Sequence, residues 1–325
     1  MTRDHGGDTD AAAARYGSGD WLDLSTGINA RPYPMPDLFA HVLNALPTAA
    51  EIAALEAAAR QAYGATVTPV ALAGAQVGIQ LVPRLADTGS ARVLGPTYNE
   101  HAGALATAGW QVAEVAGIDA LAGADIAVVV NPNNPDGRRH DPATLRALSA
   151  RVGLLVVDES FADPTPELSL AGSLGAADAR LLVLRSFGKF YGLAGLRLGF
   201  VLAGDELSAR LRSLAGPWAV SGPAIAAGRA ALADDAWRAE TVDRLHRDAA
   251  RLDALAAGAG WDLVGGAALF RTYRVAEAAA VQDALARHRI WTRIFPYAPH
   301  WIRLGLPSSE PDWSRLRAAL TGEAA

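Results

Sequence analysis

The chain has 325 residues, 51% of them hydrophobic and 19% charged, and its formal net charge is -5 at neutral pH. This length exceeds one average domain, so we expect two domains. The absence of cysteine excludes disulfides, thiolate metal sites and a cysteine nucleophile, and the lack of a basic block argues against a nucleic-acid partner.

The sequence also bears on location. No apolar run approaches the roughly 20 residues of a membrane span. The first ten residues, MTRDHGGDTD, are polar and charged, unlike a secretory signal. We therefore expect a cytoplasmic protein with no membrane partner, and the sequence predicts no metal site.

The N-terminal region is predicted to be an arm lying over another surface. Residues 1–30 mix glycine, aspartate and alanine, with a helix possible over 8–16. The proline-rich run 32–36 must be extended or a turn, because proline fixes φ and restricts the residue before it. We assign residues 1–30 to an arm that packs on the smaller domain or the active site.

Short apolar strands alternate with helical segments from residue 49 to residue 203. The predicted strands are 69–72, 91–95, 110–115, 125–130, 152–157, 180–184 and 199–203. The predicted helices are 49–62, a helix opening after Ala73, 99–108 and 141–151. This alternation is typical of an α/β fold with a mostly parallel sheet covered on both faces.

The pattern changes after Pro217. Predicted helices at 223–232, 234–257, 276–288 and 311–320 accompany predicted strands at 262–264, 268–275 and 301–306. The second of these helices is long enough to connect two domains. We expect a large domain over 31–220 and a smaller α+β domain over 221–325.

Lys189, the only lysine of the chain, lies in the run RSFGKFYGLAGLRLGF (185–200). Apolar surroundings disfavour the charged amine, so its pKa should fall and make it a usable nucleophile. Arg197 offers a planar fork suited to a phosphate, and Ser186 adds a hydroxyl donor. Together they suit an aldehyde cofactor that carries a phosphate, pyridoxal phosphate; the alternative is a surface lysine beside a glycine-rich turn.

Polar residues also follow other predicted strands, where ligands of parallel sheets bind. Asp158 could face a pyridine nitrogen and favour its protonated form, or could simply cap a helix. Asn134, in the loop NPNNPDG, could donate its amide to the ring oxygen O3′, although an ordinary Asx turn is the alternative.

Three further positions complete the candidate cofactor site. Gly74, Ala75 and Gln76 open a helix whose free backbone N–H groups could bind an anion. Tyr98 could stack on a flat cofactor, and His101, one helical turn later, could hydrogen-bond Asp158 from behind. Core packing is the alternative for both rings.

Arg303 lies in the apolar strand WIRLGL of the smaller domain. Side chains alternate along a strand, so Arg303 should lie on the face opposite Ile302 and Leu304. An arginine in such a strand needs an anionic partner. A substrate carboxylate or phosphate is one candidate, and a structural salt bridge is the other.

These motifs, in this order, resemble the fold-type I pyridoxal-phosphate enzymes of the class I/II aminotransferase family over nearly the whole chain. The resemblance implies a Schiff-base role for Lys189, phosphate contacts for Ser186 and Arg197, and a substrate-carboxylate contact for Arg303. It also implies cofactor-ring contacts for Asn134, Asp158 and Tyr98, and a homodimer, because the family builds each site from two subunits.

Finer features resemble the branch of that family that decarboxylates L-threonine O-3-phosphate to (R)-1-amino-2-propanol phosphate and CO₂ in cobalamin biosynthesis. They are HGG (5–7), LDLSTGIN (22–29) and PWAVSGPA (217–224). The resemblance implies substrate contacts for His5, Gly6 and Asn29. An aminotransferase acting on an amino-alcohol phosphate such as histidinol phosphate is the alternative.

Two departures from the family pattern matter. Phe161 stands where aminotransferases of the family usually carry a tyrosine that donates to O3′, and the decarboxylase branch accommodates phenylalanine there. The segment ALPTAAE lacks the tyrosine with which many relatives reach the partner subunit's phosphate site. The second departure leaves open which group completes that site.

Overall fold

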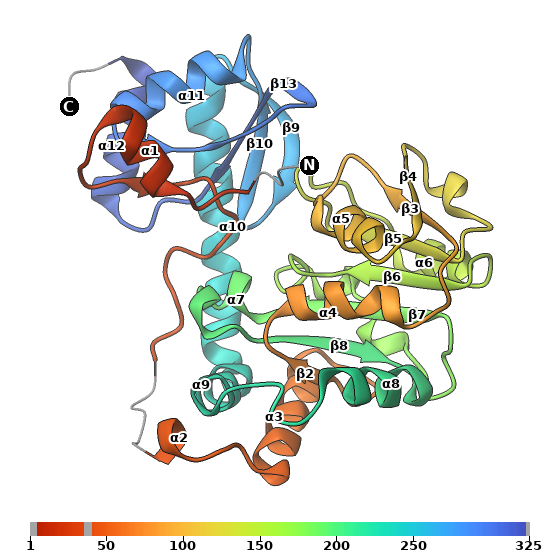
Figure 1. Ribbon diagram of the computed structural model, residues 1–325. Helices are drawn as coiled ribbons and strands as arrows, with labels where there is room; N and C mark the ends of the chain where they lie inside the picture. Colours follow the sequence, from red (N-terminus) through yellow and green to blue (C-terminus); the bar gives the residue numbers. More distant parts are fainter. Residues whose placement is uncertain (1–4, 36–40, 323–325) are drawn as a thin grey trace. The chain divides into compact units, whose positions relative to one another are not determined.

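The structure is a computed structural model that describes residues 5–35 and 41–322. The chain forms two compact units (Figure 1). The central unit comprises residues 33–134 and 139–239, and the terminal unit comprises the chain up to 32, 135–138 and from 240 onward. The division at Glu240 falls inside a helix, 19 residues beyond the boundary expected at 221, so 221–239 group with the large domain.

The central unit is built on a seven-stranded sheet in the order β2-β8-β7-β6-β5-β3-β4. Strand β8 runs antiparallel to both of its neighbours, and the other pairings are parallel. The strands are β2 (Val70–Leu72), β3 (Ser90–Leu94), β4 (Gln111–Val115), β5 (Ile126–Val130), β6 (Leu154–Asp158), β7 (Leu181–Ser186) and β8 (Gly199–Ala203). Each predicted strand of this sheet is confirmed to within two residues.

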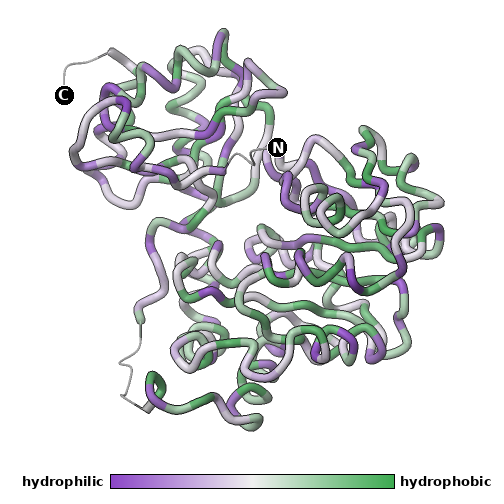
Figure 2. Tube along the Cα trace, viewed as in Figure 1, coloured by the Kyte–Doolittle hydropathy of each residue, from purple (hydrophilic) through white to green (hydrophobic). Residues whose placement is uncertain are grey.

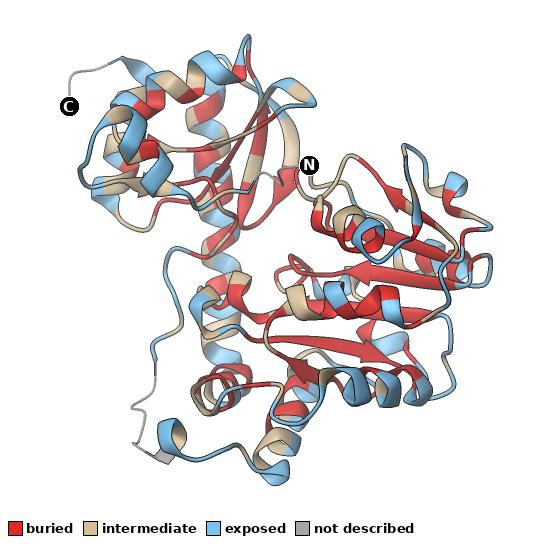
Figure 3. Cartoon of the chain, viewed as in Figure 1, coloured by how far each residue is buried: buried red, intermediate tan, exposed pale blue. Residues whose placement is uncertain are grey.

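Helices cover this sheet because its central strands are apolar on both faces. Strands β5, β6 and β8 consist mostly of hydrophobic residues (Figure 2) and are buried along their whole length (Figure 3). Residues of α4, α5 and α8 join one face of the sheet in a single hydrophobic cluster (Figure 1). The helices are α2 (His41–Asn44), α3 (Ala49–Ala62), α4 (Ala75–Leu81), α5 (Glu100–Thr107), α6 (Pro142–Ser149), α7 (Phe187–Phe190), α8 (Asp205–Ala215), α9 (Gly222–Ala233) and the start of α10 (Asp235–Gly258).

The terminal unit contains a four-stranded sheet in the order β12-β13-β10-β9 and a parallel two-stranded pair, β1-β11. The strands are β1 (Leu22–Asp23), β9 (Asp262–Ala267), β10 (Phe270–Arg274), β11 (Ile290–Trp291), β12 (Arg293–Phe295) and β13 (Ala298–Gly305). Its helices are α1 (Thr9–Tyr16), α11 (Ala278–Arg287), α12 (Glu310–Thr321) and the remainder of α10. Pairing of β1 with β11 ties the N-terminal arm to this unit.

Some elements were not predicted. Helix α8 carries Leu207 and Leu211 at helical spacing, a signal that the sequence contained. Helix α7 is one turn and includes a glycine, so no propensity marks it. Strands β1, β11 and β12 have two or three residues each and exist through their pairing. Among the described helices, none has the length and apolarity needed to cross a membrane.

Candidate active site

Polar residues of the central unit meet where its parallel strands end. Asp158 is the last residue of β6, paired with Val130 at the end of β5, and Ser186 ends the adjacent strand β7. The backbone N–H of Asn131 donates to the carbonyl of Asp158 at 2.8 Å. The carboxyl ends of parallel strands share one sheet edge, so the loop after β5, Asp158 and the Lys189 helix gather there.

Asp158 is buried and held in one orientation. His101 Nε2 donates to its Oδ2 at 2.8 Å, which confirms the predicted hydrogen bond, and the Ser160 N–H donates to Oδ1 at 2.9 Å. Burial alone would raise the pKa of Asp158, but these hydrogen bonds outweigh it, and the pKa lies below its usual value. The carboxylate is therefore ionised at neutral pH inside a low-dielectric site.

Lys189 lies on α7, directly after β7, and its side chain is half-buried. Its Nζ lies 5.8 Å from the centre of the buried Phe161 ring. A Cβ on Gly188 would lie 2.7 Å from the Ala194 backbone, so glycine allows the turn after α7 to pack closely. The amine is thus carried on a short, tightly packed turn beside an apolar ring.

Arg197 lies against the turn that opens α4. The residue is left-handed, with φ 54°, and its Nη1 donates to the Ala194 carbonyl at 3.1 Å. A Cβ on Gly74 would meet Arg197 Nη2 at 2.9 Å, and one on Gly199 would meet the Ala75 nitrogen at 2.3 Å. Two glycines therefore make room for a guanidinium beside backbone N–H groups, an arrangement suited to a phosphate.

The ring-stacking candidate and its neighbours form a hydrogen-bonded group. Tyr98 Oη donates to Gln76 Oε1 at 3.4 Å, and Gln76 Nε2 donates to buried Glu100 Oε2 at 2.7 Å. The side chain of Gln76 is committed to the protein, so its backbone is the part that remains suited to an anion. The Tyr98 and His101 rings meet edge to face, 6.2 Å apart.

The asparagine loop after β5 is held at two points. Asn131 exchanges hydrogen bonds with the His140 backbone, at 3.0 and 2.9 Å. Asn133 donates to the Pro96 carbonyl at 3.0 Å and accepts from Thr97 Oγ1 at 2.6 Å. Asn134, half-buried, follows these anchors.

The candidate substrate residues lie in the terminal unit, where Ser25 joins the arm to Arg303. The Gly7 N–H donates to Ser25 Oγ at 2.7 Å, and Ser25 Oγ donates to Asp23 Oδ1 at 2.6 Å. Arg303 Nη2 donates to the Ser25 carbonyl at 2.7 Å. A Cβ on Gly6 would lie 2.3 Å from that carbonyl oxygen, which explains a glycine there.

Arg303 is buried and directly opposite Arg293 in the β12–β13 pairing. Burial and the charge of Arg293 lower the pKa of Arg303 to about 10, so the guanidinium remains charged at neutral pH. Like charges directly opposite in a sheet are destabilising, so an anion between them would be bound favourably.

The other arm residues differ in their setting. Asn29 is buried and accepts from Arg244 Nη2 at 2.9 Å and from the Arg31 N–H at 3.1 Å. His5 is exposed. Sequence reasoning missed Arg244, because nothing in the polar helix α10 sets it apart from its other arginines.

The chain is similar to several known proteins. The model of the family "Aminotransferase class I and II" matches residues 37–320. The threonine-phosphate decarboxylase of Sinorhizobium sp. is 45% identical, covering 97% of each chain. That of Pseudomonas aeruginosa is 44% identical, covering 98% of this chain and 97% of the relative. The structure of histidinol-phosphate aminotransferase from Sinorhizobium meliloti, in complex with pyridoxal-5'-phosphate, is 19% identical with a TM-score of 0.81, covering 97% of this chain and 95% of the other.

Proposed function

The chain belongs to the aminotransferase class I and II family, and from this we propose that it is a pyridoxal-phosphate-dependent lyase. It decarboxylates L-threonine O-3-phosphate to (R)-1-amino-2-propanol phosphate and CO₂, a step of cobalamin biosynthesis. The observation that carries the proposal is the 44–45% identity to threonine-phosphate decarboxylases over nearly the whole chain. Histidinol-phosphate aminotransferase at 19% identity supports the fold alone.

The residues of the central unit fit the cofactor. Lys189 would bind it covalently, Asp158 would face the pyridine nitrogen, and Asn134 and Tyr98 would contact the ring. Ser186, Arg197 and the Gly74-Ala75-Gln76 turn would hold the phosphate in the space that a Cβ on Gly74 would fill. When bound, the cofactor supplies a ring that accepts the electron pair left by departing CO₂.

The protein's own groups prepare that chemistry. Asp158, kept ionised by His101 and Ser160, would favour a protonated ring nitrogen on the bound cofactor. Lys189 Nζ, once the substrate amine has released it from the cofactor, would be free to give a proton to the substrate carbon that lost its carboxylate. Phe161 has no hydroxyl to donate to the cofactor, in keeping with the resemblance to the decarboxylase branch.

In the terminal unit, His5, Gly6, Asn29 and Arg303 bind the anionic groups of the substrate. Support comes from the buried Arg303 facing Arg293, and from the Ser25 link that joins the arm to Arg303. A substrate with both a carboxylate and a phosphate would supply the negative charge that this pair of guanidinium groups favours.

One experiment separates the decarboxylase from its aminotransferase alternative. The purified protein, supplied with pyridoxal phosphate and L-threonine O-3-phosphate, should release CO₂ without any keto acid. Turnover that requires a keto acid and releases no CO₂ would establish the aminotransferase instead. Because Lys189 is the only lysine, borohydride reduction should fix the cofactor to wild type but not to Lys189→Ala.

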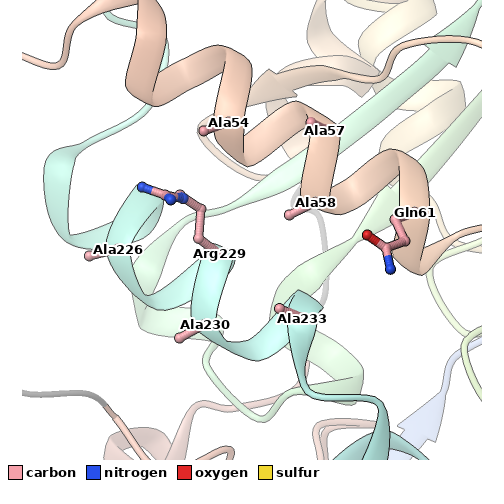
Figure 4. Close-up of a pocket in the computed structure, with 8 residues that line it drawn as sticks. All are labelled: Ala54, Ala57, Ala58, Gln61, Ala226, Arg229, Ala230 and Ala233. Carbon is pink, nitrogen blue, oxygen red and sulfur yellow. The ribbon is translucent and has the colours of Figure 1, made fainter.

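We further propose a cytoplasmic homodimer. Leu43 and Leu46, in and after α2, are 68% and 65% exposed, an unusual state for large apolar side chains. Helix α9 contacts both α2 and α3, and α3 and α9 border a groove of about 540 Å³ (Figure 4). Its lining is alanine except for Gln61 and Arg229. This apolar face suits a second copy of the chain.

A further inference from the structure

A buried polar cluster in the central unit has no role in the proposed reaction so far. It consists of Tyr63, Glu159, Asp163, Arg185 and Tyr191, here called the Arg185 cluster. Arg185 Nη1 bonds Glu159 Oε2 and its Nη2 bonds Asp163 Oδ1, both at 3.0 Å. The guanidinium carbon lies 4.3 Å from the centre of the Tyr63 ring. Arg185, 3% exposed, is thus surrounded by protein.

Among the described residues, four buried polar atoms of this cluster make no well-aligned hydrogen bond, although the Arg238 guanidinium also lies beside the Tyr191 hydroxyl. They are Tyr63 Oη, Asp163 Oδ2, Arg185 Nε and Tyr191 Oη. The contrast is Glu159, which accepts from Ser169 Oγ, from the Leu170 N–H and from Arg185. Buried polar atoms are nearly always bonded, to protein or to ordered water, so four such atoms in one cluster need a common explanation.

The two phenols lie in the field of the Asp163 carboxylate. Burial, and then the charge of Asp163, raise the pKa of both Tyr63 and Tyr191 well above the usual phenol value. Both hydroxyls therefore keep their protons at neutral pH and are able to donate. No direct bond joins either hydroxyl to the unpartnered oxygen of Asp163, so a small molecule is needed to bridge them.

The cluster also reaches the helix that carries Lys189. Tyr191 directly follows α7, and its N–H donates to the Phe187 carbonyl at 3.4 Å, closing that turn. The Tyr191 ring is stacked between Phe187 at 4.4 Å and Trp237 at 5.6 Å. Stacking fixes the plane of the ring, Phe190 meets its edge at 5.2 Å, and whatever the hydroxyl binds adds to the resistance against rotation within that plane.

We propose that ordered water fills the space among these four atoms, joins Tyr191 Oη to Asp163 Oδ2, and so fixes the end of α7 and the position of the Lys189 amine. Tyr191 is then a positioning residue. The arrangement supplies a donor in Arg185 Nε, an acceptor in Asp163 Oδ2, and two hydroxyls that do both, which matches water's two donors and two acceptors. The carboxylates of Glu159 and Asp163 are balanced by Arg185 and the nearby Arg238, so the cluster suits a neutral molecule.

Tyr191→Phe tests the proposal, because it keeps the stacked ring and removes only the hydroxyl. Tyr33→Phe is the matched control: its ring also contacts Trp237, at 5.1 Å, but its hydroxyl bonds Asp234 outside the cluster. High-resolution crystal structures should show water between Tyr191 and Asp163 in wild type and Tyr33→Phe, and its loss or displacement in Tyr191→Phe. A dry cluster in wild type would overturn the water site.

The positioning role rests on the proposed function, whereas the water site does not. We expect kcat of Tyr191→Phe to fall about tenfold with KM little changed, since small misplacements of a reacting group cost rate. Borohydride fixation of pyridoxal phosphate to Lys189 should slow similarly, a readout that needs no turnover. If Tyr191→Phe leaves both kcat and the rate of fixation unchanged, the positioning role is overturned. If wild type does not turn over threonine phosphate but Tyr191→Phe still slows fixation, only the proposed function is refuted. If Tyr191→Phe fails to fold, Tyr63→Phe tests the same water from its other hydroxyl.

Discussion

At the residue scale, Asp158 is the group whose chemistry depends most on its setting. Asp158→Asn keeps the shape and the bond to His101 but removes the charge that faces the ring nitrogen. We expect cofactor binding to persist while kcat falls several hundredfold. This corresponds to an activation barrier raised by about 3–4 kcal/mol, as for loss of a contact at a developing charge. Bound cofactor and kcat are measured together, with exposed Asp141→Asn as control. Near-normal turnover would leave Asp158 a structural role only.

The same residue predicts a pH dependence of stability. Its folded-state pKa lies below the unfolded value of about 3.9. The carboxylate therefore contributes stability above that value, and the contribution is lost as pH falls through the folded-state pKa. The free energy of unfolding of wild type should exceed that of Asp158→Asn at neutral pH, and the gap should shrink below about pH 4. Denaturant titrations at several pH values measure the gap; a constant gap would contradict the assignment.

Phe161 is the second position where one side chain bears on the outcome. Phe161→Tyr introduces a phenol beside Lys189, at a buried position. A new donor to the cofactor oxygen should slow decarboxylation or divert more turnovers to abortive transamination. The ratio of CO₂ to aminated cofactor, followed over many turnovers, measures this partition. The same ratio in both proteins would show that position 161 does not steer the reaction.

At the scale of elements, the pairing of β12 with β13 places Arg293 opposite Arg303. An anion that neutralises this repulsion should stabilise the folded protein, by about 2.7 kcal/mol at a hundredfold excess over Kd. Inorganic phosphate should therefore raise the Tm of wild type much more than that of Arg303→Met. The control is Arg274→Met, at an exposed position of β10. If phosphate raises the Tm of all three proteins equally, it binds elsewhere.

The N-terminal arm docks through a contact that tolerates no side chain at Gly6. In Gly6→Ala, the new Cβ would lie 2.3 Å from the Ser25 carbonyl oxygen, so the arm or Ser25 must shift. We expect KM for threonine phosphate to rise, with the cofactor absorption unchanged, because the cofactor residues belong to the other unit. Gly258→Ala, with open space around its Cβ, is the control. Unchanged KM in Gly6→Ala would separate the arm from the substrate.

At the scale of the whole molecule, the exposed leucines predict self-association. Leu43→Glu with Leu46→Glu should give a monomer, since burial of each leucine is worth about 1.5–3 kcal/mol and a buried charge is costly. Activity should fall with the dimer, as the family resemblance implies two-subunit sites. Sedimentation measures the mass, and Leu263→Glu, 49% exposed in the terminal unit, is the control. If the doubly substituted protein is still a dimer, the interface lies elsewhere.

The sequence by itself determined the features that depend on neighbouring residues. The strands β5 to β8 are short apolar runs, and polar groups follow them at Asn131, Asp158 and Ser186, so the sheet and its reactive edge were predictable. The three-residue spacing from Tyr98 to His101 placed the histidine on a helix, and its bond to Asp158 was predicted. Local patterns carry this information because periodicity and turn chemistry act over a few residues.

Only the tertiary structure decided which distant groups meet. Arg303 donates to Ser25 across 278 positions of the chain, and Arg185 pairs with Glu159 across 26. Neither pairing leaves a local mark. Short strands such as β12 have no periodicity, and their positions follow from the partners they bond. Burial likewise distinguishes Arg303, which needs an anion, from the many exposed arginines. Burial depends on how the chain packs and cannot be read from the order of its residues.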